Sequence, residues 1–264
     1  ILDVWKPWIQ PSDLLQGEKP YSHETIRVLA KDILSEQNIQ GDATLDVYTD
    51  ENSNESYILT SLLITSDTNI PTITINDSYQ GKKITAISSK CVGVSKFVEK
   101  LTLPSDLLFI GKEAFNIYNP GHFSCDFVDF SRCSKLEKIG ECAFNNCDIN
   151  AANINKATSL RTIEYRAFFN SDCEGIKYFD PYEPTKLDLS NLHNLKSIEA
   201  GSFWGCFSLK NEDNELMDLI LPDNIEYIGA SCFSRDLDTH PYESKIKRID
   251  MTNSKSLKKI DFIK

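Results

Sequence analysis

The sequence predicts a repeat solenoid rich in parallel β-strands, preceded by a small α+β unit. Three observations support this fold class: a recurring isoleucine, a small residue and an aromatic residue that follow it, and an alternating apolar pair that precedes it. The isoleucines are 23 to 35 residues apart, which is within the range of periods found in repeat proteins. They are Ile87, Ile110, Ile139, Ile163, Ile198, Ile228 and Ile260.

A small residue and then an aromatic residue follow most of these isoleucines. The complete copies are Ala114-Phe115, Ala143-Phe144, Ala167-Phe168, Ser202-Phe203 and Cys232-Phe233. A fainter first copy has Cys91-Val92 at this place, and the copy that begins at Ile260 stops before it. The array is therefore predicted to hold about seven repeats over residues 70–264, the last of them truncated.

Each isoleucine is also preceded by apolar residues at fixed places. An aliphatic residue lies three positions earlier, as Leu107 does before Ile110, and an alternating apolar pair lies further upstream. A spacing of two puts both members of a pair on one face of a strand and the residue between them on the other face. The pairs are Leu101/Leu103, Val128/Phe130, Ala152/Ile154, Leu187/Leu189, Leu219/Leu221 and Ile249/Met251.

One such repeat is too small to fold alone. It has about five large apolar side chains, each worth roughly 1.5–3 kcal/mol when fully buried, and ordering its backbone costs at least as much. Stacked repeats share their apolar faces and form a continuous core. Coincidence within an ordinary two-layer domain is the alternative, and five nearly identical copies argue against it.

The best copies carry a resemblance to a known family. They run from Leu101 to Phe115 (LTLPSDLLFIGKEAF) and from Leu219 to Phe233 (LILPDNIEYIGASCF). The pattern L-x-L-P-x-x-L-x-x-I-G-x-x-A-F resembles the BspA-type leucine-rich repeats, and Phe144–Cys147 and Phe203–Cys206 resemble their small-residue-then-cysteine ending. The resemblance covers roughly residues 70–264. It implies a right-handed solenoid with a parallel sheet on its concave side, and an exported or surface-exposed binding role.

Residues 1–69 lack the repeat and are expected to form a small unit of their own. The apolar residues of 22–38 recur at helical spacing, which predicts one amphipathic helix. Two strand-like runs follow, Ala43–Thr49 and Tyr57–Thr65, and the polar link between them predicts a hairpin with a long turn. Because a repeat array exposes an apolar face at its end, this unit is expected to cap the solenoid. A separate binding domain is the alternative.

Composition excludes several classes of partner. The formal net charge of −11 argues against nucleic acid and against anionic membrane surfaces. No run of 18 apolar residues occurs, so no membrane insertion is expected within this sequence.

Most of the 8 cysteines are expected to be free thiols, because five of them lie in or beside repeated small slots, where a cysteine acts as a small buried hydrophobe. Cys125, Cys133 and Cys173 fall outside the slots and are the better candidates for a disulfide or a reactive thiol. No two CxxC pairs occur, so no structural zinc site is predicted, and no feature indicates a cofactor.

Enzyme signatures are missing from the sequence. GxSxG, HExxH, GxxxxGK[ST] and a GxGxxG after a strand do not occur, and the 4 histidines are scattered through different repeats. The sequence therefore predicts a non-enzymatic protein.

The first candidate binding surface is one edge of the solenoid. Between each aromatic anchor and the next strand the chain varies from 8 to 19 residues, and such insertions project from one side of a solenoid. Aromatic residues beside prolines in exposed loops are typical of interfaces. Folding back over the flank of the solenoid is the other interpretation. The loop residues concerned are Tyr178, Phe179, Tyr182, His240 and Tyr242.

The second candidate surface is the concave sheet. Its polar row consists of the residues between the apolar pairs, namely Asp129, Asn153, Asp188 and Asp250. Lys100, Lys186 and Arg248 lie beside that row. The row could bind a basic or polar partner, although solubility alone would also place polar residues there.

These features predict a non-enzymatic module for adhesion or interaction that binds a protein or a glycan. The resemblance implies that the protein is secreted or displayed on the cell surface. An intracellular scaffold, or the recruitment arm of a larger effector-like protein, is the alternative, and free cysteines favour it. The chain opens with Ile1 and stops within a repeat at Lys264, so both ends look cut. The sequence therefore leaves open whether a leader, an anchor or a catalytic domain was removed.

Overall fold

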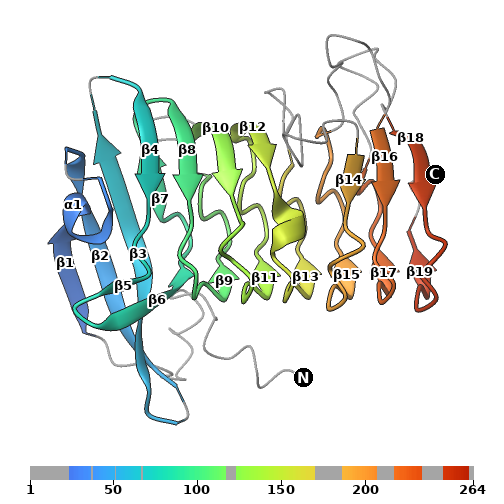
Figure 1. Ribbon diagram of the computed structural model, residues 1–264, viewed down its shortest axis with the longest axis horizontal. Coiled ribbons are helices and arrows are strands. Elements are labelled where there is room, and N and C mark those ends of the chain that lie inside the picture. The colour runs from blue at the N-terminus through green and yellow to red at the C-terminus, as the bar shows by residue number, and fades with distance from the viewer. Residues whose placement is uncertain are drawn as a thin grey trace.

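A computed structural model describes residues 24–36, 38–50, 52–66, 68–116, 123–169, 186–206, 217–233 and 246–261. Within these ranges the chain is a β-solenoid with one row of strands along each side and an N-terminal unit at one end (Figure 1). The predicted repeat solenoid is confirmed. None of the described helices has the length and apolar character needed to cross a membrane.

The recurring isoleucines form one parallel ladder, with each isoleucine paired to the isoleucine of the next repeat. We call this row the isoleucine ladder. The ladder follows from the repeat, because residues at the same position of successive stacked repeats must lie side by side. Its strands are β6 (Lys82–Ile87), β9 (Phe109–Ile110), β11 (Lys138–Ile139), β13 (Thr162–Ile163), β15 (Ser197–Ile198), β17 (Tyr227–Ile228) and β19 (Lys259–Ile260).

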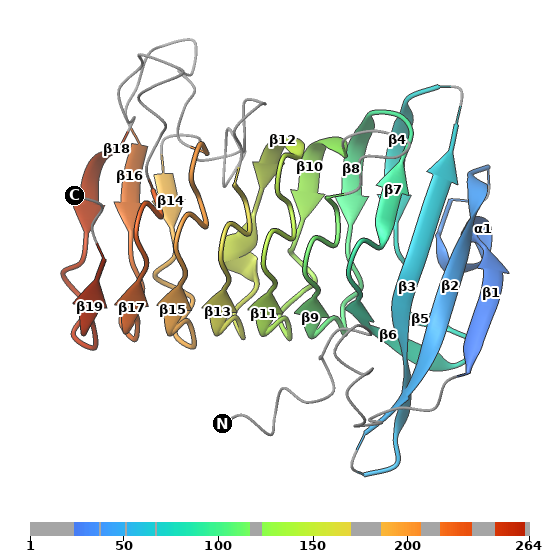
Figure 2. The same cartoon turned by 180° about the vertical axis from the view of Figure 1, so that it is seen from behind.

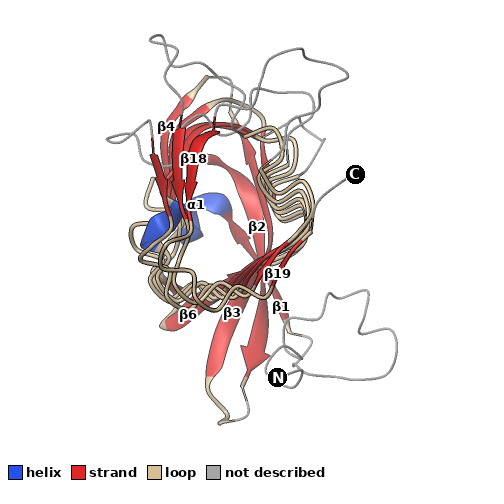
Figure 3. Ribbon diagram, turned by 90° about the vertical axis from the view of Figure 1, so that its right-hand side faces the viewer, coloured by secondary structure: helices blue, strands red, loops and turns tan. Residues whose placement is uncertain are grey.

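The alternating apolar pairs begin in the strands of the opposite side, as predicted. Figure 3, an end-on view, shows these strands facing the isoleucine ladder across the core. They form two parallel sheets, ordered β12-β10-β8-β4 and β14-β16-β18. The strands are β4 (Ile70–Thr74), β8 (Val98–Thr102), β10 (Ser124–Asp129), β12 (Asp148–Ala152), β14 (Lys186–Asp188), β16 (Met217–Ile220) and β18 (Ile246–Asp250). A single 3₁₀ turn, Ile154–Lys156, follows β12.

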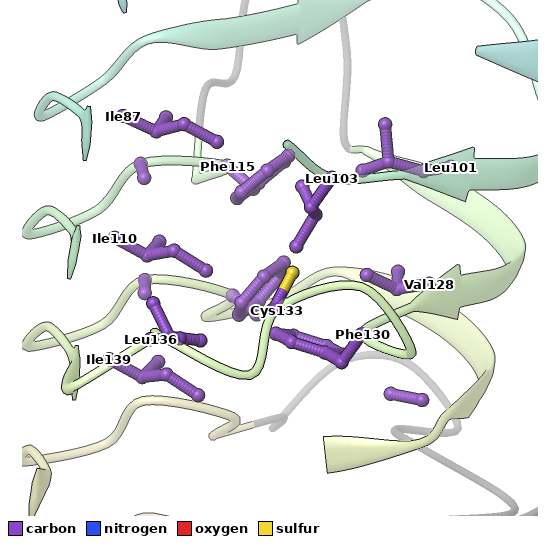
Figure 4. Packing of buried hydrophobic residues seen from close by; sticks show 14 of the residues in the cluster. Ile87, Leu101, Leu103, Ile110, Phe115, Val128, Phe130, Cys133, Leu136 and Ile139 are labelled. Carbon is purple, nitrogen blue, oxygen red and sulfur yellow. The ribbon is translucent and has the colours of Figure 1, made fainter. Parts of the chain in front are cut away.

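The aromatic anchors form a continuous column inside the solenoid. Neighbouring rings are nearly parallel, and their centroids are 4.5 Å apart for Phe115–Phe144 and 5.2 Å apart for Phe144–Phe168. Phe203 and Phe233 continue the column at 5.4 and 5.7 Å. Figure 4 shows Phe115 between the row of anchor isoleucines and two residues of the opposite side, Leu101 in β8 and Leu103 just after it. Each repeat therefore completes the core of the next.

The turn after each anchor isoleucine repeats an unusual backbone conformation. The residue three positions after the anchor has a positive φ, between 48° and 66°, in six successive repeats. Only one of the six is glycine, although side chains disfavour this left-handed region. The six residues are Lys90, Glu113, Cys142, Arg166, Gly201 and Ser231.

Glycine is needed directly after some of the anchors because the turns of adjacent repeats touch there. A Cβ on Gly229 would lie 2.3 Å from the backbone nitrogen of Ala200, and one on Gly140 would lie 2.7 Å from the carbonyl carbon of Gly111. The Ile-Gly dipeptide of the repeat is thus a close-packing requirement between repeats.

The N-terminal unit corrects one prediction. The helix expected over residues 22–38 is wrong across β1 (Thr25–Leu29), which is a strand antiparallel to β2. Among the described residues of that range only α1 (Ala30–Ile33) is helical, and Ala30 and Ile33 are buried. The helical spacing misled because Ile26 and Val28 also alternate, and these β-branched residues favour a strand that can pair with a neighbour.

The predicted hairpin is confirmed. β2 (Gln40–Thr49) pairs antiparallel with β3 (Glu55–Thr65), and the Asp50 carboxylate accepts hydrogen bonds from the backbone of Asn52 and Asn54 in the turn. β3 also pairs in parallel with β6 and with β7 (Val92–Val94), and β5 (Ser78–Tyr79) pairs with β6, so hairpin and repeats share one sheet (Figure 2). The predicted boundary at residue 69 separates strands of that sheet and stays a prediction.

The cysteine assignments need a second correction. Cys125 pairs in register with Val98 and Ile149, and so does occupy a repeated core slot. Cys133 shares a turn slot with Ala157, since the backbone N–H of each donates to the carbonyl three residues earlier. Both are free, and burial raises the pKa of each thiol to about 12, so neither is the reactive thiol expected of it. Cys173 lies outside the described residues.

Candidate functional site

The predicted loop residues cannot be placed. Tyr178, Phe179, Tyr182, His240 and Tyr242 all lie outside the described ranges. The intervals that contain them, 170–185 and 234–245, begin just after Phe169 and Phe233, and both of these residues closely follow an anchor isoleucine. The candidate site is therefore built from the described residues at the base of this edge.

Four side chains at that base stack on one another. The guanidinium carbon of Arg166 lies 5.0 Å from the ring centroid of Tyr165 and 4.5 Å from that of Phe169. Phe169 stacks on the Trp204 indole with centroids 4.4 Å apart and planes 7° from parallel. We call Tyr165, Arg166, Phe169 and Trp204 the aromatic–arginine stack.

The repeat explains how the stack forms. Phe169 and Trp204 each directly follow a residue of the phenylalanine column, Phe168 and Phe203, so they are separated by one repeat. The column rings lie in the core, while the two neighbours are only half-buried. In the two preceding repeats this slot holds Asn116 and Asn145. The stack is therefore local to two adjacent repeats.

Arg166 reaches the rings from the left-handed turn slot, with φ 53°. Its backbone N–H donates to the carbonyl of Ala200 in the next repeat, 3.1 Å away. Glycine at position 201 leaves room beside it, because a Cβ there would come within 3.3 Å of the Arg166 Cγ. Backbone and neighbouring repeat thus both set the position of this side chain.

Three cations in the repeat of Arg166 and the two repeats before it form ion pairs. Lys112 pairs with Glu141 at 2.9 Å, Lys138 with Glu164 at 2.5 Å, and Arg161 with Glu137 at 3.2 Å. Arg166 is exposed, and among the described residues no carboxylate forms an ion pair with its guanidinium. Tyr165 is 42% exposed. The stack therefore offers a cation in contact with two aromatic rings at the surface.

The polar row of the opposite sheet is bonded within the protein. Asn153 donates from Nδ2 to Asp129 Oδ1 at 3.2 Å, while its Oδ1 accepts from the backbone N–H of Phe130 at 2.6 Å. The backbone N–H of Ser131 also donates to Asp129, at 2.9 Å. Both side chains are buried. Their bonds close the turn after the strand and link neighbouring repeats.

Asp188 and Asp250 also accept a hydrogen bond from the turn that follows the strand. Asp188 accepts from the backbone N–H of Ser190 at 3.0 Å, and Asp250 accepts from that of Thr252 at 3.0 Å. The cations beside the row are also paired. Lys100 contacts Asp129 at 2.8 Å, Lys186 contacts Asp188 at 2.9 Å and Arg248 contacts Asp218 at 3.0 Å. A binding role for this row stays a prediction.

Titration of Asp129 reflects these bonds. Burial acts to raise the pKa of this carboxyl, but hydrogen bonds from Lys100, Ser131 and Asn153 prevail and lower it to about 2. Asp129 is therefore ionised at neutral pH and serves as a fixed acceptor. The described part of the chain contains no group of three or more His, Cys, Asp or Glu residues that could hold a metal ion.

Sequence reasoning missed the aromatic–arginine stack. The available signal was the pair of dipeptides Phe168-Phe169 and Phe203-Trp204, in which a second aromatic follows the core aromatic in two successive repeats. The contribution of Arg166 had no such signal, because it depends on the left-handed turn that aims the side chain at the rings.

Comparison with known proteins bears on the repeat. The family described as "BspA type Leucine rich repeat region" matches residues 63–177 and 116–260, in 6 copies. A search of curated proteins finds no match. Among solved structures, the Leucine Rich Repeat protein of T. pallidum (TpLRR) is similar at 15% identity and a TM-score of 0.28, over 72% of this chain and 85% of that one. A TM-score this low adds nothing to the family assignment.

Proposed function

This chain belongs to the BspA-type leucine-rich repeat family, and we propose that it binds a protein or glycan partner through the edge that carries its long loops. The family is one of binding and interaction modules. The finer part of the proposal is the surface used, and one observation carries it. The aromatic–arginine stack lies exposed at the base of the loop edge, with Tyr, Trp and Arg, the residue types that dominate binding energy at interfaces.

Two observations support this edge over the opposite sheet. The Asp129 and Asn153 side chains of that sheet are engaged in hydrogen bonds within the protein, and breaking them to bind a partner would cost stability. Arg166 and its rings are held in place without a carboxylate partner among the described residues. A surface already ordered before binding loses less entropy when a partner arrives.

We further propose that the module acts outside the cell, secreted or displayed on the surface, as an adhesion or interaction protein. The resemblance of its repeats to exported proteins supports this location. Partners include the glycans and proteins of a neighbouring cell or matrix.

The test compares binding by the wild-type chain and by edge variants. Trp204→Ala, and the triple change of Tyr178, Tyr182 and Tyr242 to Ala, should each lower binding to immobilised extracellular proteins and glycan arrays at least tenfold, about 1.4 kcal/mol. Thermal unfolding checks that each variant is folded. Asp188→Asn and Asp250→Asn on the opposite sheet are the matched controls. Loss of binding only in those controls would move the site to the sheet.

An intracellular scaffold, or a recruitment arm of a larger effector-like protein, is the second candidate. The observation that favours it is a set of free thiols among the described residues, namely Cys91, Cys125, Cys133, Cys142 and Cys232, of which all but Cys142 are buried. Such thiols fold in a reducing compartment without risk of wrong disulfides. A thiol count under denaturing, non-reducing conditions on protein from its native source separates the two, because disulfides among these cysteines would exclude this candidate.

A further inference from the structure

We propose that the aromatic–arginine stack is a docking site for a protein segment that carries an acidic side chain next to an apolar one. This proposal rests on the proposed function and names the chemistry of the partner. Its basis is the geometry of Arg166 and the two rings that its guanidinium contacts, together with the absence of a carboxylate partner of Arg166 among the described residues.

The guanidinium is the part of the site that selects charge. Tyr165 and Phe169 contact it through their rings, at 5.0 and 4.5 Å from the centroids, so its N–H groups remain for a ligand. A guanidinium presents these donors in a planar fork that matches the two oxygens of a carboxylate. Stacking holds that fork still before the ligand arrives, which lowers the entropy cost of binding.

Charge complementarity at this edge points the same way. Lys112, Lys138 and Arg161, in the same and the two preceding repeats, each contact a glutamate. Arg166 has no such partner in the described ranges, although the chain as a whole carries a net charge of −11. Its guanidinium therefore remains open to the carboxylate of a partner.

The rings define the apolar half of the ligand. Phe169 is engaged by the Arg166 guanidinium and by the Trp204 indole, which lies 4.4 Å away. With the faces at the centre of the stack engaged, the ring edges and the 42% exposed Tyr165 remain for contact. Leu, Ile or Phe side chains pack well against such rings, and a peptide can place one of them directly beside an Asp or a Glu. A peptide segment therefore supplies both halves of the ligand.

The experiment selects peptides from a phage-displayed library of random twelve-residue sequences on the immobilised full-length chain. We expect enriched peptides with Asp or Glu directly beside Leu, Ile, Phe or Trp. Their affinity for Arg166→Gln should fall at least tenfold, and Arg166→Lys should fall nearly as far because it keeps the charge but lacks the fork. Arg161→Gln, in the same repeat but paired with Glu137, is the matched control and should bind as the wild type does.

Thermal unfolding of each variant checks the fold, and Gln occupies the left-handed turn at position 166 at the same backbone cost as Arg. Three results would overturn the proposal: no enrichment, enriched peptides without an acidic residue, or equal binding to Arg166→Gln. Binding of sialylated or uronic-acid glycans on an array, lost in Arg166→Gln while no peptide is enriched, would replace the protein segment with a glycan. If Trp204→Ala loses extracellular partners while Arg166→Gln keeps them, the proposed function stands and this inference fails.

Discussion

At the scale of single residues, one slot shows how the repeat tolerates strain. The residue three positions after each anchor isoleucine adopts a left-handed conformation that disfavours a side chain by roughly 1–2 kcal/mol. Five of the six described repeats nevertheless carry a side chain there. Arg166 uses this strained position to reach Tyr165 and Phe169, so the strain has a use at that site.

Replacing Ser231 with glycine should stabilise the protein. Its φ of 55° is strained for serine but not for glycine, so the substitution relieves strain in the folded state. Glycine also raises the entropy of the unfolded chain, and the net gain in the free energy of unfolding is about 0.5–1 kcal/mol. Chemical denaturation of Ser231→Gly measures the change. The reciprocal variant Gly201→Ser, with φ 66°, should lose stability, and its Cβ would also crowd Arg166. Two variants that shift the midpoint in the same direction would contradict this account of the slot.

The low pKa of Asp129 should make the free energy of unfolding fall as the pH is lowered through the acid range. Its pKa in the folded protein, about 2, lies below the ordinary 3.8, so the folded state favours the ionised form. The stabilisation, about 2 kcal/mol, is complete above roughly pH 4 and is lost as the pH falls through 2. Asp129→Asn should flatten the fall in the free energy of unfolding between pH 4 and 2. Asp126→Asn, on the same strand but exposed, is the control and should leave that slope unchanged.

At the scale of elements, the strands and turns owe their stability to the repeats beside them. The isoleucine ladder is built mostly from two-residue strands, which are far too short to persist alone. Their hydrogen bonds run from one repeat to the next, while the phenylalanine column joins the same repeats through the core. Hydrogen bonding and apolar burial therefore act along the same axis.

Truncating the centre of the column should be costly. Phe168 is buried between Phe144 and Phe203, so Phe168→Ala should lower the free energy of unfolding by about 3–5 kcal/mol. Phe169→Ala removes the next ring, which is only half-buried, and should cost clearly less. Urea denaturation of both variants gives the comparison. Equal losses would show that the column is not the principal core of these repeats.

At the scale of the whole molecule, the two ends of the solenoid differ. The hairpin strand β3 pairs with β6 and covers the first repeat. In the last described repeat Ile249 and Met251 are 44% and 42% exposed, whereas Leu187 and Leu219, which share the slot of Ile249, are fully buried. In a solenoid each repeat contacts only its neighbours, so burial depends on the position along the stack.

This asymmetry predicts unequal mutational costs at one slot. Leu187→Ala should lower the free energy of unfolding by about 2–5 kcal/mol, while Ile249→Ala should cost under about 1.5 kcal/mol because less apolar surface is lost. Thermal or urea denaturation of the two variants tests the prediction. Comparable costs would mean that position along the stack does not govern the contribution of a slot.

The repeat could be predicted because its core residues recur at similar positions in each copy of the sequence pattern. Recurring isoleucines, most of them with an aromatic residue five positions later, can be buried together only by stacking, and the structure places them in one ladder and one column. The N-terminal helix could not be predicted correctly, because Ile26, Leu29 and Ala30 fit a helical period while Ile26 and Val28 fit a strand period. The pairing of β1 with β2 decided between them.

The sequence by itself determined the stacked architecture, since packing slots recur in every copy and need no knowledge of distant neighbours. Only the tertiary structure decided which side chains are available to a partner. Asp129 and Asn153 are polar residues in a row, yet hydrogen bonds between repeats engage them. Trp204 meets Phe169 only because stacking brings equal slots of two repeats together, and the left-handed turn of their own repeat brings Arg166 to Tyr165 and Phe169. Spacing encodes burial, whereas exposure and charge pairing depend on contacts between repeats.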